Sequence, residues 1–182
     1  MIKVVKTEIP GLLVIEPRLH KDARGYFFES YNERLFVEHG IEFRFVQDNE
    51  SRSAKNVIRG LHYQLEPHAQ TKLLRVLDGA VLDVVVDLRR NSPSYGKWKS
   101  FEISAANKLQ ILVPKGCAHG FRVLSEYATV FYKCDSYYHP ESERGLLFSD
   151  PGLAIEWGID PGKALVSEKD ANSPLFADAE KN

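Results

Sequence analysis

The chain has 182 residues, with 24 Lys and Arg against 25 Asp and Glu and a formal net charge of -1 at pH 7. This balance excludes a nucleic-acid binder that works through bulk positive charge, and 8 Tyr, 10 Phe and 2 Trp exclude a disordered chain. No apolar run approaches the roughly 20 residues of a membrane span, so we expect no membrane partner. The early charges of the N-terminus do not resemble a signal peptide, and two cysteines without a CxxC pair indicate a reduced, cytoplasmic protein.

Short apolar or alternating runs, separated by turn residues, recur along the chain as in an all-β domain. One helix is expected, capped by Asn32 and ended by Gly40, and Asp78-Gly79 is expected to form a hairpin turn. The expected strands are, in chain order, 12–16, 26–31, 43–46, 57–64, 71–77, 81–88, 97–103, 109–113, 118–124 and 127–135.

The regular spacing of these strands indicates a single domain over residues 1–182, built as a jelly-roll barrel or sandwich. The region after about residue 140 is richer in Gly and Pro, and we expect it to wrap over the barrel or to form a short helix. A barrel of this size can hold a ligand in its mouth. Polar residues on otherwise apolar strands are therefore the candidates for a site.

Two strands each carry a histidine, His62 and His119. Alternation places His62 on one face of its strand and Arg59 on the other. Zinc and iron sites need three or four ligands, but the first strand offers only His62, because Glu66 and His68 fall in a loop around a proline. We therefore expect no metal. On spacing alone, a core histidine bonded to a backbone carbonyl is the favoured interpretation of His62.

Three cations are candidates for an anion site. Lys72 shares a strand face with Leu74, so its ammonium either points into the barrel or lies in solvent at an edge. Arg24 is presented by a turn over residues 22–25, and with Arg59 and Lys72 it can bind phosphate, unless the three are unrelated surface charges.

Five further side chains are weighed as candidates for the site. Asp83 can orient a histidine ring, whereas we expect Asp87 to be exposed and solvated. Tyr132 lies on an apolar strand face, where a phenol either packs against a partner or donates a proton. Tyr138 falls in an expected loop, where it can stack on a flat ligand. Its local sequence identifies Asp170 only as a surface charge.

Seven segments together carry a family resemblance. They are, in order, Asp22-Ala23-Arg24-Gly25-Tyr26-Phe27-Phe28-Glu29, Phe45-Val46-Gln47-Asp48-Asn49, Arg59-Gly60-Leu61-His62-Tyr63-Gln64, Gln70-Thr71-Lys72-Leu73, Pro114-Lys115-Gly116-Cys117-Ala118-His119-Gly120-Phe121, Tyr132-Lys133 and Leu165-Val166-Ser167-Glu168-Lys169-Asp170. This set closely resembles the dTDP-4-dehydrorhamnose 3,5-epimerases over about residues 9–170. Each segment alone is weak, but seven in one order are specific.

The resemblance implies an all-β, cupin-type jelly-roll barrel with short peripheral helices, no metal and no cofactor. It implies epimerisation of dTDP-4-dehydro-6-deoxy-D-glucose at carbons 3 and 5, with His62 as base, Tyr132 as acid on the opposite face, Asp170 paired with His62, and Lys72 facing the sugar carbonyl. The positions that match substrate contacts in the family are Arg24, Glu29, Gln47, Asp48, Asn49, Arg59, His119, Glu143 and Lys169, with Tyr138 as the residue that stacks on thymine.

The resemblance also implies a homodimer, because members of the family complete the nucleotide site with residues from a partner subunit. Thr71, Cys117 and Phe148 depart from the residues usual in the family, although none is the expected acid or base. The alternatives are a related epimerase that inverts one carbon, a metal-dependent barrel enzyme, and a non-catalytic sugar-nucleotide binding module.

Overall fold

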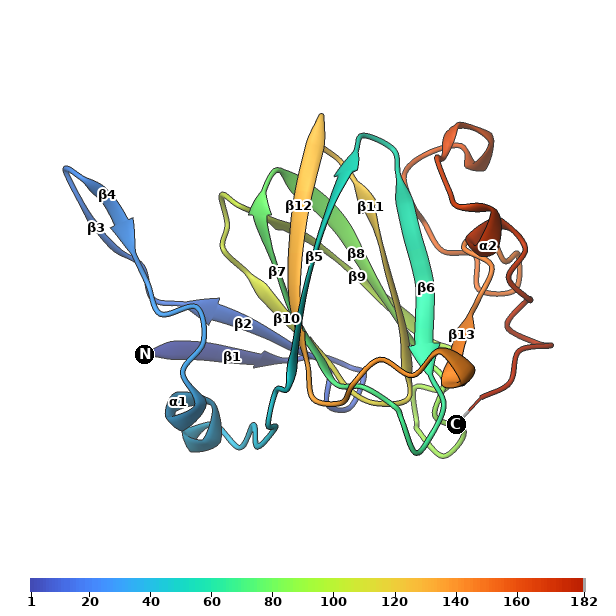
Figure 1. Ribbon diagram of the computed structural model, residues 1–182, viewed down its shortest axis with the longest axis horizontal. Helices are drawn as coiled ribbons and strands as arrows, with labels where there is room; N and C mark the ends of the chain where they lie inside the picture. Colours follow the sequence, from blue (N-terminus) through green and yellow to red (C-terminus); the bar gives the residue numbers. More distant parts are fainter. Residues whose placement is uncertain (182) are drawn as a thin grey trace.

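The chain forms two β-sheets that face each other in a barrel, in a computed structural model that describes residues 1–181 (Figure 1). The first sheet has six strands, in the spatial order β1 (Ile2–Lys6), β2 (Leu13–Pro17), β10 (Gln110–Val113), β7 (Lys72–Asp78), β12 (Tyr127–Cys134) and β5 (Gln47–Ala54). The second has five, in the order β13 (Glu143–Gly145), β6 (Ile58–Gln64), β11 (Cys117–Val123), β8 (Ala80–Asp87) and β9 (Trp98–Ser104). All these pairings are antiparallel.

Few and short helices accompany the sheets, and a separate hairpin projects from the barrel. The hairpin consists of β3 (His20–Asp22) and β4 (Gly25–Phe27), and Figure 1 shows it extending away from both sheets. The helical elements are α1 (Glu33–Glu38), η1 (Pro140–Ser142), η2 (Pro161–Lys163) and α2 (Glu168–Ala171). The Asn32 side chain accepts a hydrogen bond from the Leu35 backbone N–H, so the expected cap of α1 is confirmed. The expected jelly-roll architecture with short peripheral helices is confirmed as well.

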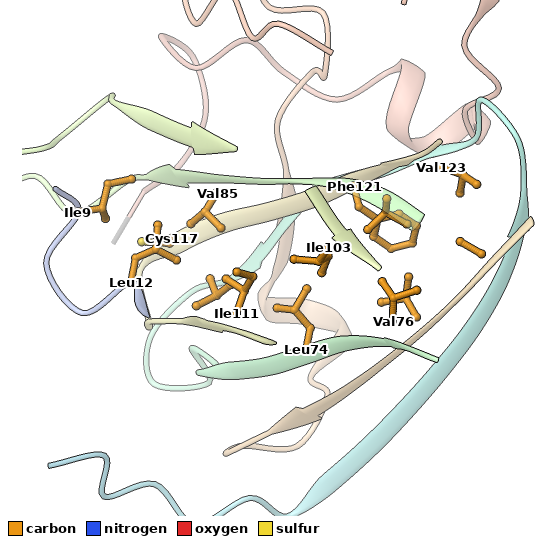
Figure 2. Close-up of a cluster of buried hydrophobic side chains, with 14 residues drawn as sticks. Ile9, Leu12, Leu74, Val76, Val85, Ile103, Ile111, Cys117, Phe121 and Val123 are labelled. Carbon is orange, nitrogen blue, oxygen red and sulfur yellow. The ribbon is translucent and has the colours of Figure 1, made fainter. Parts of the chain in front are cut away.

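The main core lies between the two sheets. Alternation along the strands directs one face of each sheet inward, where Leu74, Val85, Ile111 and Phe121 meet in one buried cluster (Figure 2). Burying side chains of this size stabilises the fold by about 1.5–3 kcal/mol each. The inward face therefore carries most of the apolar packing, and polar residues on the same face stand out.

Two smaller cores join the outer faces of the sheets to the rest of the chain. On the five-stranded sheet, Leu61 of β6 packs with Leu146, Phe148 and Trp157 of the C-terminal segment. On the six-stranded sheet, Phe36 of α1 belongs to a cluster with side chains of β2, β7 and β10. The C-terminal segment is thereby held against the outside of β6, the strand that carries His62.

Several expected strands differ from the structure. The segment 26–31 forms only the short β4, and 43–46 is not a strand. The side chains of Phe43 and Phe45 pack against the core beside α1. β1 and β5 were not expected. β5 (sequence QDNESRSA) has no apolar alternation, since its partly buried positions are polar. A strand that lines a polar cavity lacks the hydrophobic signal that identifies strands.

The turn at Asp78-Gly79 does not close a hairpin, because β7 and β8 lie in different sheets. It carries the chain from one sheet to the other. Gly79 has a φ of +77°, and a Cβ there would lie 2.0 Å from the Tyr127 carbonyl oxygen. Only glycine fits this conformation and this space.

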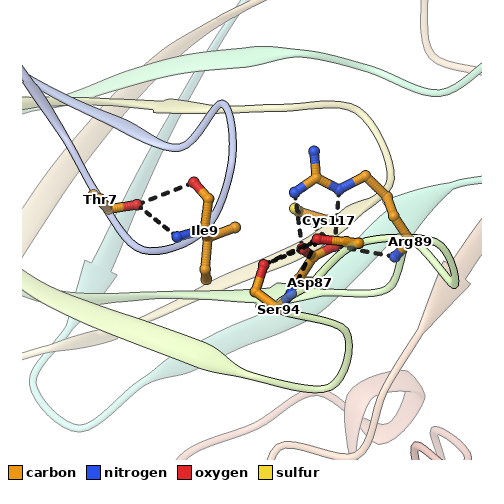
Figure 3. Close-up of polar contacts among 7 residues, drawn as sticks. Thr7, Ile9, Asp87, Arg89, Ser94 and Cys117 are labelled. Atoms are coloured by element: carbon orange, nitrogen blue, oxygen red, sulfur yellow. Dashed lines mark hydrogen bonds and ion pairs between the residues drawn. The ribbon is translucent and has the colours of Figure 1, made fainter.

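Asp87 is buried, so the expectation of an exposed carboxylate is wrong. It has no exposed surface, and Arg89 Nε donates to Oδ1 at 2.8 Å, while Ser92 and Ser94 hydroxyls donate to Oδ2 (Figure 3). Burial raises the pKa of Asp87, but these hydrogen bonds outweigh it and lower the pKa to about 2. Asp87 lies on the same strand face as the buried Val81 and Val85, and its partners, which lie two to seven residues further on, make burial tolerable. None of the helices among residues 1–181 has the length and hydrophobicity needed to cross a membrane.

Candidate active site

A cavity of about 210 Å³ is lined from both sheets. Its walls come from β5, β7 and β12 of one sheet and from β6 and β13 of the other. The lining residues are Gln47, Asn49, His62, Tyr63, Gln64, Gln70, Lys72, Tyr132, Tyr138 and Glu143. Seven of them are residues that the sequence predicted for the site, which makes this cavity the candidate active site.

His62 is paired with Asp170, as the family resemblance implied. His62 Nε2 lies 2.7 Å from Asp170 Oδ1, and the Gly60 backbone N–H donates to Oδ2 at 3.1 Å. Asp170 lies on α2, whose cap Ser167 fixes its backbone. Burial raises the pKa of Asp170, but the bonds from His62, Gly60 and Ser167 outweigh it and lower the pKa overall. A carboxylate only accepts, so Nε2 carries the hydrogen and Nδ1 is the basic nitrogen of His62.

A bulge in β6 changes the faces that its side chains occupy. His62 pairs with His119 and Arg59 pairs with Phe121, so β6 has one residue more than β11 between these pairs. Arg59 therefore lies on the same face as His62, and the prediction that the two lie on opposite faces is wrong. Its Nε donates to Ser53 Oγ of β5 at 2.9 Å. The bulge needs Gly60, because its φ is +111° and a Cβ would lie 2.7 Å from the His119 carbonyl oxygen.

Tyr132 and Lys72 reach the cavity from the sheet opposite His62. Burial is the main cause that raises the pKa of the Tyr132 phenol, so the group holds its proton at neutral pH. Lys72 Nζ lies 5.9 Å from the centre of the Tyr132 ring, and burial lowers the pKa of Lys72. Of the two alternatives that the sequence left open for Lys72, the structure has the one in which the side chain points into the barrel. The cavity thus has an imidazole on one wall and a phenol with a lysine side chain on the other.

Tyr138 is held at the mouth of the cavity by polar contacts. Its hydroxyl donates to Glu143 Oε2 at 2.7 Å, and its backbone N–H donates to Gln47 Oε1 at 2.9 Å. Glu143 also forms an ion pair with Lys169 of α2. The ring of Tyr138 is half exposed, which leaves a face free to stack on a flat group.

Seven predicted site residues are not among those that line the cavity: Asp170, Arg59 and Lys169, described above, and Asp48, His119, Arg24 and Glu29. Asp48 lies on the opposite face of β5 from Gln47 and Asn49 and pairs with Lys133 at 2.9 Å. His119 is buried and bonded through Nε2 to Asp83 Oδ2 at 2.6 Å, as the alternative for Asp83 anticipated. The other two, Arg24 and Glu29, belong to the projecting hairpin and the segment after it.

Within this one chain, Arg24 does not join Arg59 and Lys72. Its guanidinium is exposed and paired with Asp22 at 2.6 Å, and the hairpin that carries it extends away from the barrel (Figure 1). The anion site of three cations expected from one chain is therefore not formed. Within the turn over residues 22–25, the Arg24 backbone N–H also donates to Asp22 Oδ1 at 2.8 Å.

Gln64 and Gln70 contribute to the site without having been predicted. Gln64 Oε1 accepts from the His139 backbone N–H at 2.8 Å, and Gln70 Nε2 donates to the Ser136 carbonyl at 2.8 Å. These two bonds fix the loop that carries Tyr138. Gln64 follows His62 by two residues on the same strand, so alternation was the signal that could have identified it.

The two barrel histidines do not form a metal site with their neighbours. His62 and His119 lie opposite each other across β6 and β11, but each is bonded to its own carboxylate. Among residues 1–181, no three His, Cys, Asp or Glu side chains are grouped as metal ligands would be. Cys117 and Cys134 are both free and buried.

Comparison with known proteins gives a consistent family. The family model described as dTDP-4-dehydrorhamnose 3,5-epimerase matches residues 6–178. The chain is 49% identical over 180 residues to the dTDP-4-dehydrorhamnose 3,5-epimerase of Shigella flexneri, covering 98% of both chains. It is similar to a crystal structure of the enzyme of that name from Elizabethkingia anophelis NUHP1, with a TM-score of 0.94, 51% identity and coverage of 97% of each chain. A Legionella pneumophila dTDP-6-deoxy-D-glucose-3,5-epimerase in complex with dTDP-4-keto-L-rhamnose also has a TM-score of 0.94, with 46% identity and coverage of 99% of this chain and 95% of that one.

Proposed function

The chain belongs to the dTDP-4-dehydrorhamnose 3,5-epimerase family of isomerases, and on this premise we propose that it inverts carbons 3 and 5 of dTDP-4-dehydro-6-deoxy-D-glucose to give dTDP-4-dehydro-L-rhamnose. One observation carries the proposal. His62 and Tyr132 line the same cavity from opposite sheets. Inversion of a carbon next to a ketone needs a proton removed from one face and a proton delivered to the other.

His62 is the proposed base. Its Nδ1 takes the proton from the carbon beside the carbonyl, and the electron pair of that C–H bond moves onto the carbonyl oxygen as an enolate. Asp170 fixes the ring and stabilises the imidazolium that forms, across the 2.7 Å contact. The ammonium of Lys72 stabilises the enolate oxygen, an effect that is strongest where water is excluded.

Tyr132 is the proposed acid. Its phenol gives its proton to the opposite face of the same carbon, and the enolate collapses back to the ketone. Exchange with solvent then returns His62 and Tyr132 to their starting protonation states, and the cycle repeats at the second carbon. Each proton-transfer group contributes roughly 10²- to 10⁴-fold in rate. No redox step occurs, since both proton transfers leave the oxidation state unchanged.

The remaining predicted contacts are proposed to hold the nucleotide and the sugar. Tyr138 stacks on thymine from its position at the mouth. Arg59 offers a bidentate guanidinium to the pyrophosphate. The others proposed as substrate contacts are Gln47, Asp48, Asn49, His119, Glu143 and Lys169. A cytoplasmic location is part of the same proposal, and two free cysteines in the described chain are consistent with it.

A homodimer explains the position of the projecting hairpin. Tyr26 and Phe27 are 56% and 67% exposed, which is costly for rings on a two-stranded arm unless a second copy covers them. Arg24 and Glu29 lie on or beside this arm and away from their own cavity. We propose that they complete the nucleotide site of the partner subunit in a two-fold symmetric dimer.

The proposal is tested by product formation with a matched pair of variants. The purified protein is given dTDP-4-dehydro-6-deoxy-D-glucose, and a reductase specific for the L-configured product traps it. We expect His62→Asn to abolish the product while dTDP binding is retained, and His39→Asn, on the exposed end of α1, to behave as the wild type. Turnover that survives in His62→Asn would remove this residue from the role of base. Tight dTDP binding without any product from the wild type would leave a binding module.

A further inference from the structure

A second buried histidine–carboxylate pair lies inside the barrel, and its carboxylate has no part in the mechanism so far. Asp83 on β8 has no exposed surface, and its Oδ2 accepts a hydrogen bond from His119 Nε2 at 2.6 Å. His119 lies directly opposite His62, so the two histidines are cross-strand neighbours with separate carboxylates. Burying a carboxylate is costly unless its charge is compensated. Asp83 therefore needs a compensating charge in addition to the single bond from His119.

The second oxygen of Asp83 is uncommitted. Within residues 1–181, Oδ1 is buried and has no hydrogen-bond partner. Asp83 shares the inward face of β8 with Val85, Lys72 shares that of β7 with Leu74, and Val85 and Leu74 meet in the core between the sheets. Burial is the main cause that lowers the pKa of Lys72, and the charges of Cys134, Glu143 and Asp83, in this order, oppose the lowering. An ammonium in a buried site needs such a negative charge to keep its proton.

The other ionisable groups around Lys72 are already engaged. Burial raises the pKa of Cys134 on β12 to about 11, so this group is a neutral thiol at neutral pH. Glu143 on β13 is paired with Lys169 and accepts from the Tyr138 hydroxyl. Tyr132 on β12 is a neutral phenol and His62 on β6 is bonded to Asp170. Asp83 is thus the buried carboxylate near Lys72 that has no lysine or arginine partner among the described residues.

We propose that Asp83 is a positioning residue of the epimerisation site, which holds the ring of His119 and supplies the negative charge that keeps Lys72 an ammonium. The inference rests on the proposed function, because the role of Lys72 at the substrate carbonyl belongs to it. An ammonium stabilises an enolate oxygen, whereas a neutral amine does not. Asp83 touches no substrate and acts through Lys72 and His119.

The test compares Asp83→Asn with Asp87→Asn as a matched control. Both are fully buried carboxylates on the same face of β8, but Asp87 is bonded to Arg89 and two serines and is not among the groups that act on the pKa of Lys72. Deuterium entry from heavy water into carbons 3 and 5 of the substrate is measured over a series of pD values. This exchange needs the base and the cation but not reprotonation by Tyr132.

We expect Asp83→Asn to lower the maximal exchange rate by about 10- to 100-fold. The basic limb of its profile should move to lower pD by about one unit, because a buried ammonium without its counter-charge loses the proton more readily. Asp87→Asn should reduce thermal stability and leave the basic limb in place. Asp83→Glu keeps the charge, so its basic limb should stay at the position of the wild type even if the maximal rate falls.

Three results decide against the inference. The first is an Asp83→Asn profile whose basic limb coincides with that of the wild type. The second is an equal displacement of the limb in Asp83→Asn and Asp87→Asn, which would indicate a general loss of packing. If Asp83→Asn does not fold, a displaced limb in Asp83→Glu is the contradicting result. Absence of exchange in the wild type would instead overturn the proposed function itself, and this inference with it.

Discussion

Replacing Asp170 with Asn tests how much the carboxylate contributes to proton abstraction. The change keeps the shape of a side chain that is 3% exposed but removes the negative charge 2.7 Å from His62 Nε2. Unit charges about 4 Å apart attract by about 4 kcal/mol at an effective dielectric constant near 20. His62 is partly exposed, so we reduce this to about 2–3 kcal/mol. The imidazolium loses this stabilisation, which predicts a kcat that is roughly 30- to 150-fold lower.

The assay for Asp170→Asn is product formation with the reductase trap, together with calorimetric titration of dTDP. We expect kcat to fall while the Kd for dTDP stays close to that of the wild type, because Asp170 contacts the base and not the nucleotide. Asp160→Asn is the control, since Asp160 caps η2 in the same C-terminal segment and its loss leaves the cavity unchanged. A kcat within threefold of the wild type, or equal losses in both variants, would contradict a contribution of the Asp170 charge to proton abstraction.

The other predictions concern the acid, the fold and the dimer. Tyr132→Phe should lose product formation but retain deuterium exchange, seen by NMR; normal product formation would remove Tyr132 from the role of acid. Asp87→Asn should lower the free energy of unfolding by about 2 kcal/mol at pH 7, because a pKa of about 2 in the folded state lies below the ordinary value of 3.8. This contribution is present above pH 3.8 and is lost as the pH falls toward 2, so urea unfolding should show the two proteins converging in acid; a constant difference would contradict it. Arg24→Ala should raise the KM for substrate about tenfold or more without changing the dimer seen by light scattering, and an unchanged KM would count against a shared site. Gly60→Ala should destabilise the protein by about 2 kcal/mol or more, through strain at positive φ and the clash with β11, and a melting temperature like that of the wild type would contradict the bulge geometry.

Alternation and turn residues predicted most of the barrel, and they failed where the inner face is polar. β5 carries Gln47, Asn49, Ser51 and Ser53 on its partly buried side, so its sequence looks like a loop. Sequence patterns identify strands through the alternation of buried hydrophobic side chains, and a strand that lines a polar cavity lacks this alternation. The sequence also did not predict that the tight turn at Asp78-Gly79 joins strands of two different sheets.

The sequence predicted most of the residues that line the candidate site, but it predicted their arrangement less well. Asp170 is 108 positions from His62 and was identified only through family resemblance, because no local pattern links a one-turn helix to a distant strand. Arg59 was placed on the wrong face, since a bulge adds one residue that alternation does not anticipate. Arg24 shows a third limit: it lies on an arm that projects away from the cavity, and spacing within one sequence does not show where such an arm lies.

In the proposed mechanism, a base and an acid on opposite walls of the cavity invert two carbons of one sugar. The most direct measurement is proton NMR of dTDP-4-dehydro-6-deoxy-D-glucose incubated with the wild-type protein in heavy water. We predict deuterium at both carbon 3 and carbon 5, together with formation of the L-configured product. Deuterium at one carbon alone would show a single-carbon epimerase, and no deuterium at either carbon, with dTDP still bound, would contradict the catalytic roles of His62 and Tyr132.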